Sequence, residues 1–365
     1  MKFRCERDVL VEALGIAGRA VSGRGGGLLP ALSGVRAVLE GDQLQVTGSD
    51  LDLTITVSVT VSGQSDGVAV IPSRLASDIV RALEPGAVHV EADGDELRIR
   101  AGRGEFGIRL ITADEFPQPN VIATEPVSLA SEQLAAALKQ VIPAASSDDS
   151  RPILTGVLLA AEAGGLRLVA TDSYRLAVRD VPGVSVLEEG QSVLVPSRAL
   201  GELNRILGQG DETHLRLGER EASFEVGPVR LVTRLIEGDF PNYRGLIPAS
   251  HPNTLSVARE ELLDALRRVR LLAREATPVR LEMSSDGLDL VAITQDVGQA
   301  REQVEGTYEG TVLTVAFNPQ YLMDGVDVAP GDQITLSTID ELRPALVRSV
   351  DHEEFLYLLM PVRVS

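Results

Sequence analysis

The chain of 365 residues is 44% hydrophobic, which supplies cores for two or three domains and excludes a disordered protein. Its formal net charge is −19, and because the acidic excess runs through the whole chain, affinity for a polyanion requires positive side chains gathered on one surface. Aromatic residues make up only 3% and Trp is absent, which argues against a protein that stacks single-stranded bases. The single Cys5, the lack of a secretory signal and the lack of a long apolar run predict a cytoplasmic protein without an intramolecular disulfide or a membrane span.

The first elements of the chain alternate between helix and strand. A helix is predicted over residues 6–21, and residues 35–61 show the apolar alternation and turn signals of antiparallel strands. A second helix begins at Pro72, which the first turn of a helix tolerates, and three more short strands follow Pro85 and Gly86. The face of this second helix that is expected to be buried carries Leu75, Ile79, Val80 and Leu83.

The same order of elements recurs twice more. The segment VIPSRLASDIVRAL from Val70 returns as LVPSRALGELNRIL from Leu194 and more faintly as AFNPQYLMDGV from Ala316. TGSDLDLTI, ATDSYRLAV and AITQDVGQA keep the same step, and FGIRLITADEFPQPN returns as VRLVTRLIEGDFPNY. Helices are expected again over 130–142 and 259–275. The chain is therefore predicted to be three copies of one α+β domain, each with two amphipathic helices and about seven or eight strands in antiparallel sheets, divided as 1–122, 123–250 and 251–365.

Motifs that carry catalysis or metal binding are weak. Gly102 to Gly107 fits the GxGxxG pattern, but strands are predicted on both sides of it, so a hairpin turn is expected in place of a nucleotide loop. No Walker A or SxxK motif is present and the four histidines are far apart, so no catalytic residue, metal site or cofactor is predicted. Asp50 and Asp52, with Asp172 at the matching place in the second copy, are interpreted as turn residues. The alternative is a repeat-built, metal-dependent hydrolase that uses these carboxylates.

Positive charge is concentrated on the predicted helices. On the helix expected over 259–275, Leu262, Leu266, Val269 and Ala273 form an apolar stripe, and arginines align beside it at helical spacing. Contacts from Arg and Lys to phosphate are independent of base sequence, so these faces suit a protein that holds DNA without reading it; an ordinary solvated surface is the alternative. The predicted DNA-binding residues are Arg24, Arg74, Arg81, Lys139, Arg151, Arg198, Arg205, Arg267, Arg270 and Arg274.

Five spaced motifs together resemble one family over essentially the whole chain. They are TDSYRLAV from Thr171, the paired PSR segments, DFPNYR from Asp239, FNPQYL from Phe317 and YLLMPVRV from Tyr357. In order and spacing they are similar to the bacterial DNA polymerase III β subunit, the DNA sliding clamp.

This resemblance implies a processivity factor that is not an enzyme. Three-domain subunits would join head to tail as a homodimer, the first domain of one chain against the third of the next, and form a ring that encircles duplex DNA. Weak phosphate contacts on the inner helices would permit sliding, and acidity elsewhere would repel DNA from the wrong surface. The implied partners are duplex DNA, the clamp loader, the replicative DNA polymerase and other proteins that bear a short clamp-binding peptide.

The resemblance also implies a partner-peptide pocket between the second and third domains, with apolar anchors as its ligand. A groove of this kind that contains methionine suits several competing partners. The residues carried over to it are Leu154, Thr171, Tyr174, Arg175, Leu176, Pro241, Leu246, Asn318, Tyr321, Leu342, Pro344, Leu358, Leu359, Met360, Pro361, Val362 and Arg363.

The chain departs from the family pattern in three places. Ser173 and Tyr174 replace a common Gly-His pair, and Gly245 stands where an arginine is frequent; both changes bear on peptide affinity and selectivity. The run of glycines over 25–27 widens the loop after Arg24. A specialised clamp paralogue, for example a copy that confers resistance to a clamp-directed inhibitor, is an alternative within the same family.

Overall fold

The computed structural model describes residues 1–21, 29–112, 116–117, 122–162, 164–273 and 277–363. The chain forms two compact units, each described here by itself: unit 1 comprises residues 1–132 and 202–235, and unit 2 comprises residues 133–201 and 236–365. Within the described ranges, no helix has the length and apolar character needed to cross a bilayer.

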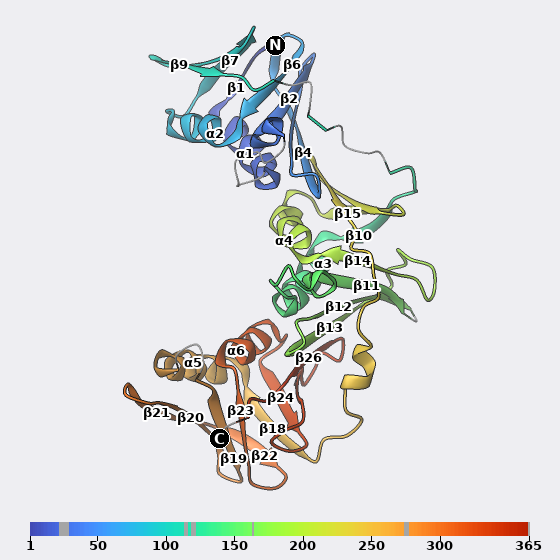
Figure 1. Ribbon diagram of the computed structural model, residues 1–365, viewed down its shortest axis with the longest axis vertical. Helices are drawn as coiled ribbons and strands as arrows, with labels where there is room; N and C mark the ends of the chain where they lie inside the picture. The colour runs from blue at the N-terminus through green and yellow to red at the C-terminus, as the bar shows by residue number, and fades with distance from the viewer. Residues whose placement is uncertain (22–28, 113–115, 118–121, 163, 274–276, 364–365) are drawn as a thin grey trace. The chain divides into compact units, whose positions relative to one another are not determined.

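Unit 1 contains two antiparallel sheets (Figure 1). The first has the order β5-β1-β7-β8-β9, formed by Ser62–Ser65, Lys2–Glu6, Ala87–Asp93, Glu96–Ala101 and Gly104–Arg109. The second has the order β10-β15-β16-β17-β4-β3-β2-β6, formed by Val127–Ala130, Glu212–Leu217, Glu221–Val226, Val229–Arg234, Leu53–Thr60, Gln43–Ser49, Gly34–Glu40 and Gly67–Pro72. Helices α1 (Arg7–Ala17) and α2 (Ser73–Ala82) pack on each other and on the second sheet.

Unit 2 also contains two antiparallel sheets. One has the order β14-β11-β12-β13-β26-β25-β24-β18-β22, formed by Ser192–Pro196, Gly156–Glu162, Gly165–Thr171, Arg175–Pro182, Phe355–Leu359, Ala345–Ser349, Gln333–Thr338, Asn253–Ala258 and Gly306–Glu309. The other has the order β21-β20-β19-β23, formed by Gly298–Val304, Gly287–Thr294, Val279–Ser284 and Leu313–Phe317. Helices α5 (Arg259–Val269) and α6 (Pro319–Val328) pack together. The chain passes between the units within α3 (Ser131–Val141), within α4 (Ser197–Ile206) and again after β17.

The strand order repeats three times, as the sequence predicts. The run β6-β2-β3-β4 matches β14-β11-β12-β13 and β23-β19-β20-β21, and in each case the chain enters a helix directly after the first strand of the run. The run β1-β7-β8-β9 likewise matches β10-β15-β16-β17 and β18-β24-β25-β26. The prediction of an α+β fold with two helices in each copy is confirmed. The expected seven or eight strands are exceeded by the short edge strands β5 and β22.

Sheets continue from one copy into the next. β4 of the first copy pairs with β17 of the second, and β13 of the second copy pairs with β26 of the third. We call these two strand pairs the first junction and the second junction. Each lies inside one compact unit, which explains why the units do not coincide with the sequence repeats.

The predicted buried face of α2 is wrong at Leu75. That side chain is 50% exposed, whereas Ser73, Ala76 and Val80 are buried. Helices α1 and α2 pack closely, and a Cβ placed at Gly18, directly after α1, would lie 3.0 Å from the hydroxyl oxygen of Ser73. The small residues therefore face inward, and the leucine one position away is turned out.

Two predicted helices end earlier than expected. The helix expected over 6–21 is α-helical only to Ala17, and the one expected over 259–275 only to Val269, each followed by a short 3₁₀ turn, η1 (Gly18–Ala20) and η7 (Arg270–Leu272). Leu262, Leu266 and Val269 are buried as predicted, but Ala273 lies beyond the end of the helix and is only half-buried. Apolar spacing continues through a 3₁₀ turn, so it does not mark where the α-helix ends.

The FNPQYL motif encodes the start of α6. The Asn318 side chain accepts hydrogen bonds from the backbone N–H groups of Gln320 (2.9 Å) and Tyr321 (3.2 Å), and proline occupies the first helical position. Farther along the helix, Gly325 packs against the ring of Tyr357 on β26, where a Cβ would lie only 2.4 Å from ring atoms. The phenol of Tyr357 donates to the carbonyl oxygen of Tyr321 at 2.8 Å. The helix is thus fixed on the second junction.

Candidate partner-binding site

The same carboxylate-capped turn precedes the junction strand in the first two copies. Asp50 accepts hydrogen bonds from two backbone N–H groups at 3.1 and 2.8 Å, and Asp172 accepts from two at 2.9 and 3.0 Å. This confirms the interpretation of these carboxylates as turn residues. Gly102 to Gly104 likewise form the predicted hairpin turn, between β8 and β9. Among the described residues, no three His, Cys, Asp or Glu side chains are grouped as metal ligands.

One residue of each matching turn adopts a left-handed backbone conformation. The φ angle is +81° at Leu51, +81° at Ser173 and +62° at Asp296. An L residue in this region costs roughly 1 to 2 kcal/mol. The first two turns join paired residues at equal spacing, Ser49 with Thr54 and Thr171 with Leu176, so their backbone has been kept while the side chains changed. The third turn, between Thr294 and Gly298, is one residue shorter.

Arg175, the first residue of β13, is the ionic centre of the second turn. Its side chain is 10% exposed and pairs with Asp172 at 3.0 Å and with Asp324 of α6. Its guanidinium carbon lies 4.2 Å from the ring centroid of Tyr321. Burial opposes the charge, but Tyr357 and the two carboxylates outweigh it and raise the pKa of Arg175 above its ordinary value. The side chain therefore ties the turn to α6 as a permanent cation.

Tyr174 and Tyr321 form an accessible aromatic pair beside this centre. Tyr174 is 57% exposed, the two ring centroids are 6.4 Å apart, and the ring planes differ by 29°. The tail after β26 passes along this pair, because the N–H of Met360 donates to the carbonyl oxygen of Tyr174 at 2.8 Å and that of Val362 donates to Ala316 at 2.7 Å. Met360 and Val362 remain 36% and 38% exposed. The arrangement can contact an apolar ligand from two sides.

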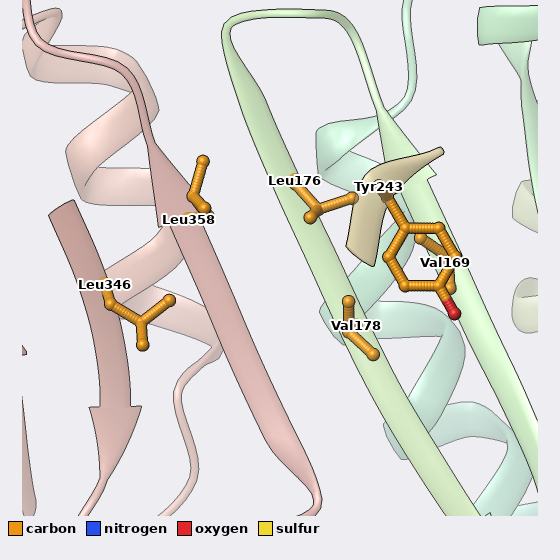
Figure 2. Packing of buried hydrophobic residues seen from close by; sticks show 6 residues of the cluster. All are labelled: Val169, Leu176, Val178, Tyr243, Leu346 and Leu358. Atoms are coloured by element: carbon orange, nitrogen blue, oxygen red, sulfur yellow. The ribbon is translucent and has the colours of Figure 1, made fainter. Parts of the chain in front are cut away.

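Several of the predicted pocket residues are buried in the core, so they can only support the bottom of a pocket from below. Figure 2 shows Leu176 on β13, Leu358 on β26 and Leu346 on β25, with Tyr243 of η6 (Tyr243–Leu246) lying beside Val169. The buried members of the predicted set are Leu154 (9% exposed), Thr171 (4%), Leu176 (1%), Leu358 (2%) and Leu359 (0%).

The remaining predicted residues are accessible to different degrees. Asn318, Tyr321, Pro344 and Pro361 are half-buried, and Pro241, Leu246, Leu342 and Arg363 are exposed. Leu342, Val362 and Arg363 line one hollow of about 540 Å³ together with Arg280, Thr314, Ala316 and Glu341.

Sequence reasoning missed two groups of residues at this site. Arg280 and Thr314 reach the hollow through the pairing of β19 with β23, and Glu341 reaches it from the segment before β25. Asp324 lies 149 positions from the arginine that it holds, so no local pattern connects the two. Asp172 was visible as a turn residue, but its ion pair with Arg175 was not.

The predicted DNA-binding residues that lie on described helices are exposed. Arg74, Lys139, Arg198 and the 3₁₀-turn residue Arg270 all point to solvent. Three others each pair with an acidic residue one helical turn earlier, which partly neutralises the basic faces: Arg81 with Asp78 (3.8 Å), Arg205 with Glu202 (2.9 Å) and Arg267 with Asp264 (3.0 Å).

Three predicted DNA contacts need separate mention. Arg24 and Arg274 lie outside the described residues. Arg151 lies before the 3₁₀ turn η4 (Pro152–Thr155), where it pairs with Asp148 at 3.0 Å and donates to the carbonyl oxygen of Asp172 at 3.3 Å. The structure therefore places Arg151 behind the second turn and not on a helix.

The sequence matches three consecutive family domains. Residues 1–121 match the N-terminal domain of the DNA polymerase III beta subunit, residues 128–242 its central domain and residues 244–363 its C-terminal domain. Among similar proteins, the beta sliding clamp of Streptomyces coelicolor is 34% identical and that of Bacillus subtilis 31% identical, with the whole of each chain covered.

Solved structures show the same likeness over the full length. The DNA polymerase sliding clamp from Bacillus subtilis superposes with a TM-score of 0.92 at 30% identity, covering 100% of both chains. The sliding clamp of Bartonella birtlesii bound to griselimycin gives 0.92 at 30% identity, and that of Pseudomonas aeruginosa bound to griselimycin 0.92 at 29%, again over both whole chains. With its three clamp domains, the chain belongs to the DNA polymerase III beta subunit family, the non-catalytic beta sliding clamps.

Proposed function

We propose that this chain encircles duplex DNA in the cytoplasm and tethers the replicative polymerase and other proteins to it. The observation that carries the proposal is the match of three consecutive clamp domains over the full chain, in a fold that repeats one strand order three times. A protein of this kind acts by topology, so it needs exposed surfaces for DNA and for partners but no reaction centre.

Two open strand edges support closure of the ring. The junctions within the chain pair β4 with β17 and β13 with β26. By the repeat, the strands that match the third such pair are β21 and β9, and each lies at the edge of its sheet. Open edges offer unpaired backbone groups to another chain. We therefore propose that β9 of one subunit pairs with β21 of a second copy, and that two such head-to-tail contacts close a dimer.

Exposed apolar side chains accompany both edges. On unit 1, Phe106 of β9 is 39% exposed and Leu75 of α2 is 50% exposed. On unit 2, Leu271 of η7 is 84% exposed, and Val297, which precedes β21, is 41% exposed. Large apolar residues left in water favour burial in an interface, which supplies a reason for the outward turn of Leu75.

The mass of the protein in solution tests the proposed dimer. Light scattering should give a mass near twice 38.9 kDa. Phe106→Arg or Leu271→Arg should each reduce it to that of one chain, because a charge would be buried in the contact. Val312→Arg is the control, since Val312 is 80% exposed but lies before β23, at the opposite edge of its sheet from β21. A single-chain mass for the unaltered protein at micromolar concentration would reject the ring.

Retention on DNA tests encirclement. Protein loaded by its proposed partner, the clamp loader, onto nicked circular DNA should survive a high-salt wash and should be lost once the circle is cut. Equal loss from circular and linear DNA would contradict the proposal. The exposed Arg74, Lys139 and Arg270 are proposed to contact phosphates, so replacing all three with Gln should weaken the salt-dependent attraction without altering sequence preference.

The site around Tyr174 and Tyr321 is proposed to take a short partner peptide with apolar anchors. Its support is the accessible aromatic pair beside the exposed tail residues Met360 and Val362. We propose that the chain also binds griselimycin, as two of the similar clamps do. Decapeptides selected on the full chain from a random display library should carry apolar anchors and should lose affinity in Met360→Asp. Recovery of no such peptide would reject the site.

Ser173 and Tyr174 stand at this site in place of the common Gly-His pair. A specialised, inhibitor-resistant paralogue is therefore the second candidate function. Calorimetry with griselimycin separates the two functions when it is combined with a growth test after deletion of the gene. Tight binding and loss of growth support the replicative clamp. Absent binding and normal growth support the specialised copy.

A further inference from the structure

A charged hollow extends the proposed partner site along the tail. Its volume is about 540 Å³, and its walls come from β19, β23, the segment before β25 and the tail. Leu342, Val362 and Arg363 belong to the proposed peptide site, whereas Arg280 and Glu341 do not. A ligand that passes the tyrosine pair along the tail therefore leaves an apolar surface and enters one that carries charge.

Backbone contacts fix the walls of this hollow. The N–H of Val362 donates to the carbonyl oxygen of Ala316 at 2.7 Å, so the tail is held beside β23. On the opposite wall, a carboxylate oxygen of Asp340 accepts from the N–H groups of Leu342 and Arg343, both at 2.9 Å. These bonds all lie within the chain itself, so little ordering is needed when a side chain enters.

The two arginines of the hollow lack the carboxylate partners that Arg301 of the same unit has. Arg301 on the same small sheet pairs with Glu282 at 2.8 Å and with Asp289 at 2.9 Å, which uses the carboxylates nearest to Arg280 along β19 and β20. Within the described residues, no carboxylate pairs with Arg280 or with Arg363. Both guanidinium groups at the hollow can therefore pair with a carboxylate of a ligand.

Glu341 also lines the hollow, and its negative charge opposes the binding of an anion there. Two guanidinium groups and one carboxylate leave a net charge of about +1, which favours a single carboxylate ligand. A guanidinium offers two parallel N–H donors to a carboxylate, a geometry that an amide or an ammonium group does not match.

We infer that this hollow is a subsite for an acidic residue that flanks the apolar anchors of a partner peptide. The inference rests on the proposed partner site and deepens it, because it states which peptides the chain prefers. Partners would then be ranked by a carboxylate outside the anchors, and this ranking would weaken as salt rises.

A charge scan of one peptide tests the inference. A labelled decapeptide selected on the full chain is remade with Glu, Gln or Lys at each position outside its anchors, and affinities are measured by fluorescence anisotropy at low and at high salt. At one or two positions the Glu peptide should bind about fivefold more tightly than the Gln peptide. In Arg280→Gln this ratio should fall below about twofold, and in Glu341→Gln it should rise.

Arg301→Gln is the matched control, because that arginine lies on the same sheet but is already paired; the ratio should stay near fivefold. Denaturation curves check that each variant is folded. Equal affinity of the Glu and Gln peptides, or a preference that persists in Arg280→Gln, overturns the subsite and leaves the partner site standing. Failure to recover any peptide rejects both.

Discussion

The two junctions inside the chain have the same turn backbone but different side chains. At the first junction the turn ends in Asp52 and Leu53, and Leu53 is buried in the core with 2% exposure. At the second junction the matching residues are Tyr174 and Arg175, which engage Tyr321 by ring contact and by cation–π contact. The repeat therefore provides the same turn at both junctions. Tyr174 and Arg175, in place of Asp52 and Leu53, make only the second junction a candidate partner site.

The largest difference between the junctions should appear when Arg175 is replaced by the residue of the first junction. Arg175→Leu leaves Asp172, whose side chain is 9% exposed, and Asp324 without their cation. We expect the free energy of unfolding to fall by about 3 to 4 kcal/mol, since a buried charge that loses its partner is strongly destabilising. Guanidinium denaturation followed by circular dichroism measures this loss.

Arg234→Leu is the control for that experiment. Its pair with Asp52 at the first junction spans 3.7 Å with side chains 62% and 73% exposed, so its removal should change stability by less than about 0.5 kcal/mol. Equal losses in the two variants would show that the ionic centre is not what distinguishes the second junction.

The strand before each turn differs between the first two copies at one position, which is glycine in the first copy and alanine in the second. Gly48 on β3 lies so close to α1 that a Cβ would be 2.0 Å from the carbonyl oxygen of Ala17, yet the matching position in the second copy is Ala170, which is fully buried. Gly48→Ala should therefore cost about 2 to 3 kcal/mol, because backbone must move. Ala170→Gly should cost only about 1 kcal/mol. Thermal denaturation of both variants checks the ranking, and a harmless Gly48→Ala would contradict it.

Exchanging the exposed turn residues Asp52 and Tyr174 between the junctions should change peptide affinity but not the stability of the fold. Tyr174→Asp gives the second junction the residue of the first; because Tyr174 is 57% exposed, stability should change by less than about 0.5 kcal/mol. Peptide affinity should fall about tenfold, which is roughly 1.4 kcal/mol, through loss of aromatic contact. Anisotropy with the selected decapeptide measures this. Asp52→Tyr should create no second site, and restored binding in the double variant would refute the assignment.

Sequence alone predicted much of what the junctions are built from but not how they join. The repeat, the two helices in each copy and the turn role of Asp50 and Asp172 follow from local patterns and agree with the structure. The exposure of Leu75 does not, because it depends on how closely α1 approaches α2. The ion pair between Arg175 and Asp324 is likewise a product of tertiary packing.

The smallest expected effect concerns the left-handed residues of the turns. Leu51 and Ser173 share a φ of +81°, so glycine should relieve backbone strain of about 1 kcal/mol or more at each position. Against this gain, glycine gives the unfolded chain more conformational freedom, which costs about 0.5 to 1 kcal/mol of stability. Leu51→Gly and Ser173→Gly should thus each raise the free energy of unfolding by about 0.5 kcal/mol in urea denaturation. Asp296→Gly should gain less, because Asp tolerates a φ of +62°. Only Ser173→Gly should also loosen Tyr174 and weaken the selected peptide, by about twofold, since the other two turns carry no tyrosine to position. If Leu51→Gly and Ser173→Gly gain equal stability but only Ser173→Gly binds the peptide more weakly, the first two copies share the turn backbone and only the second copy carries the partner site.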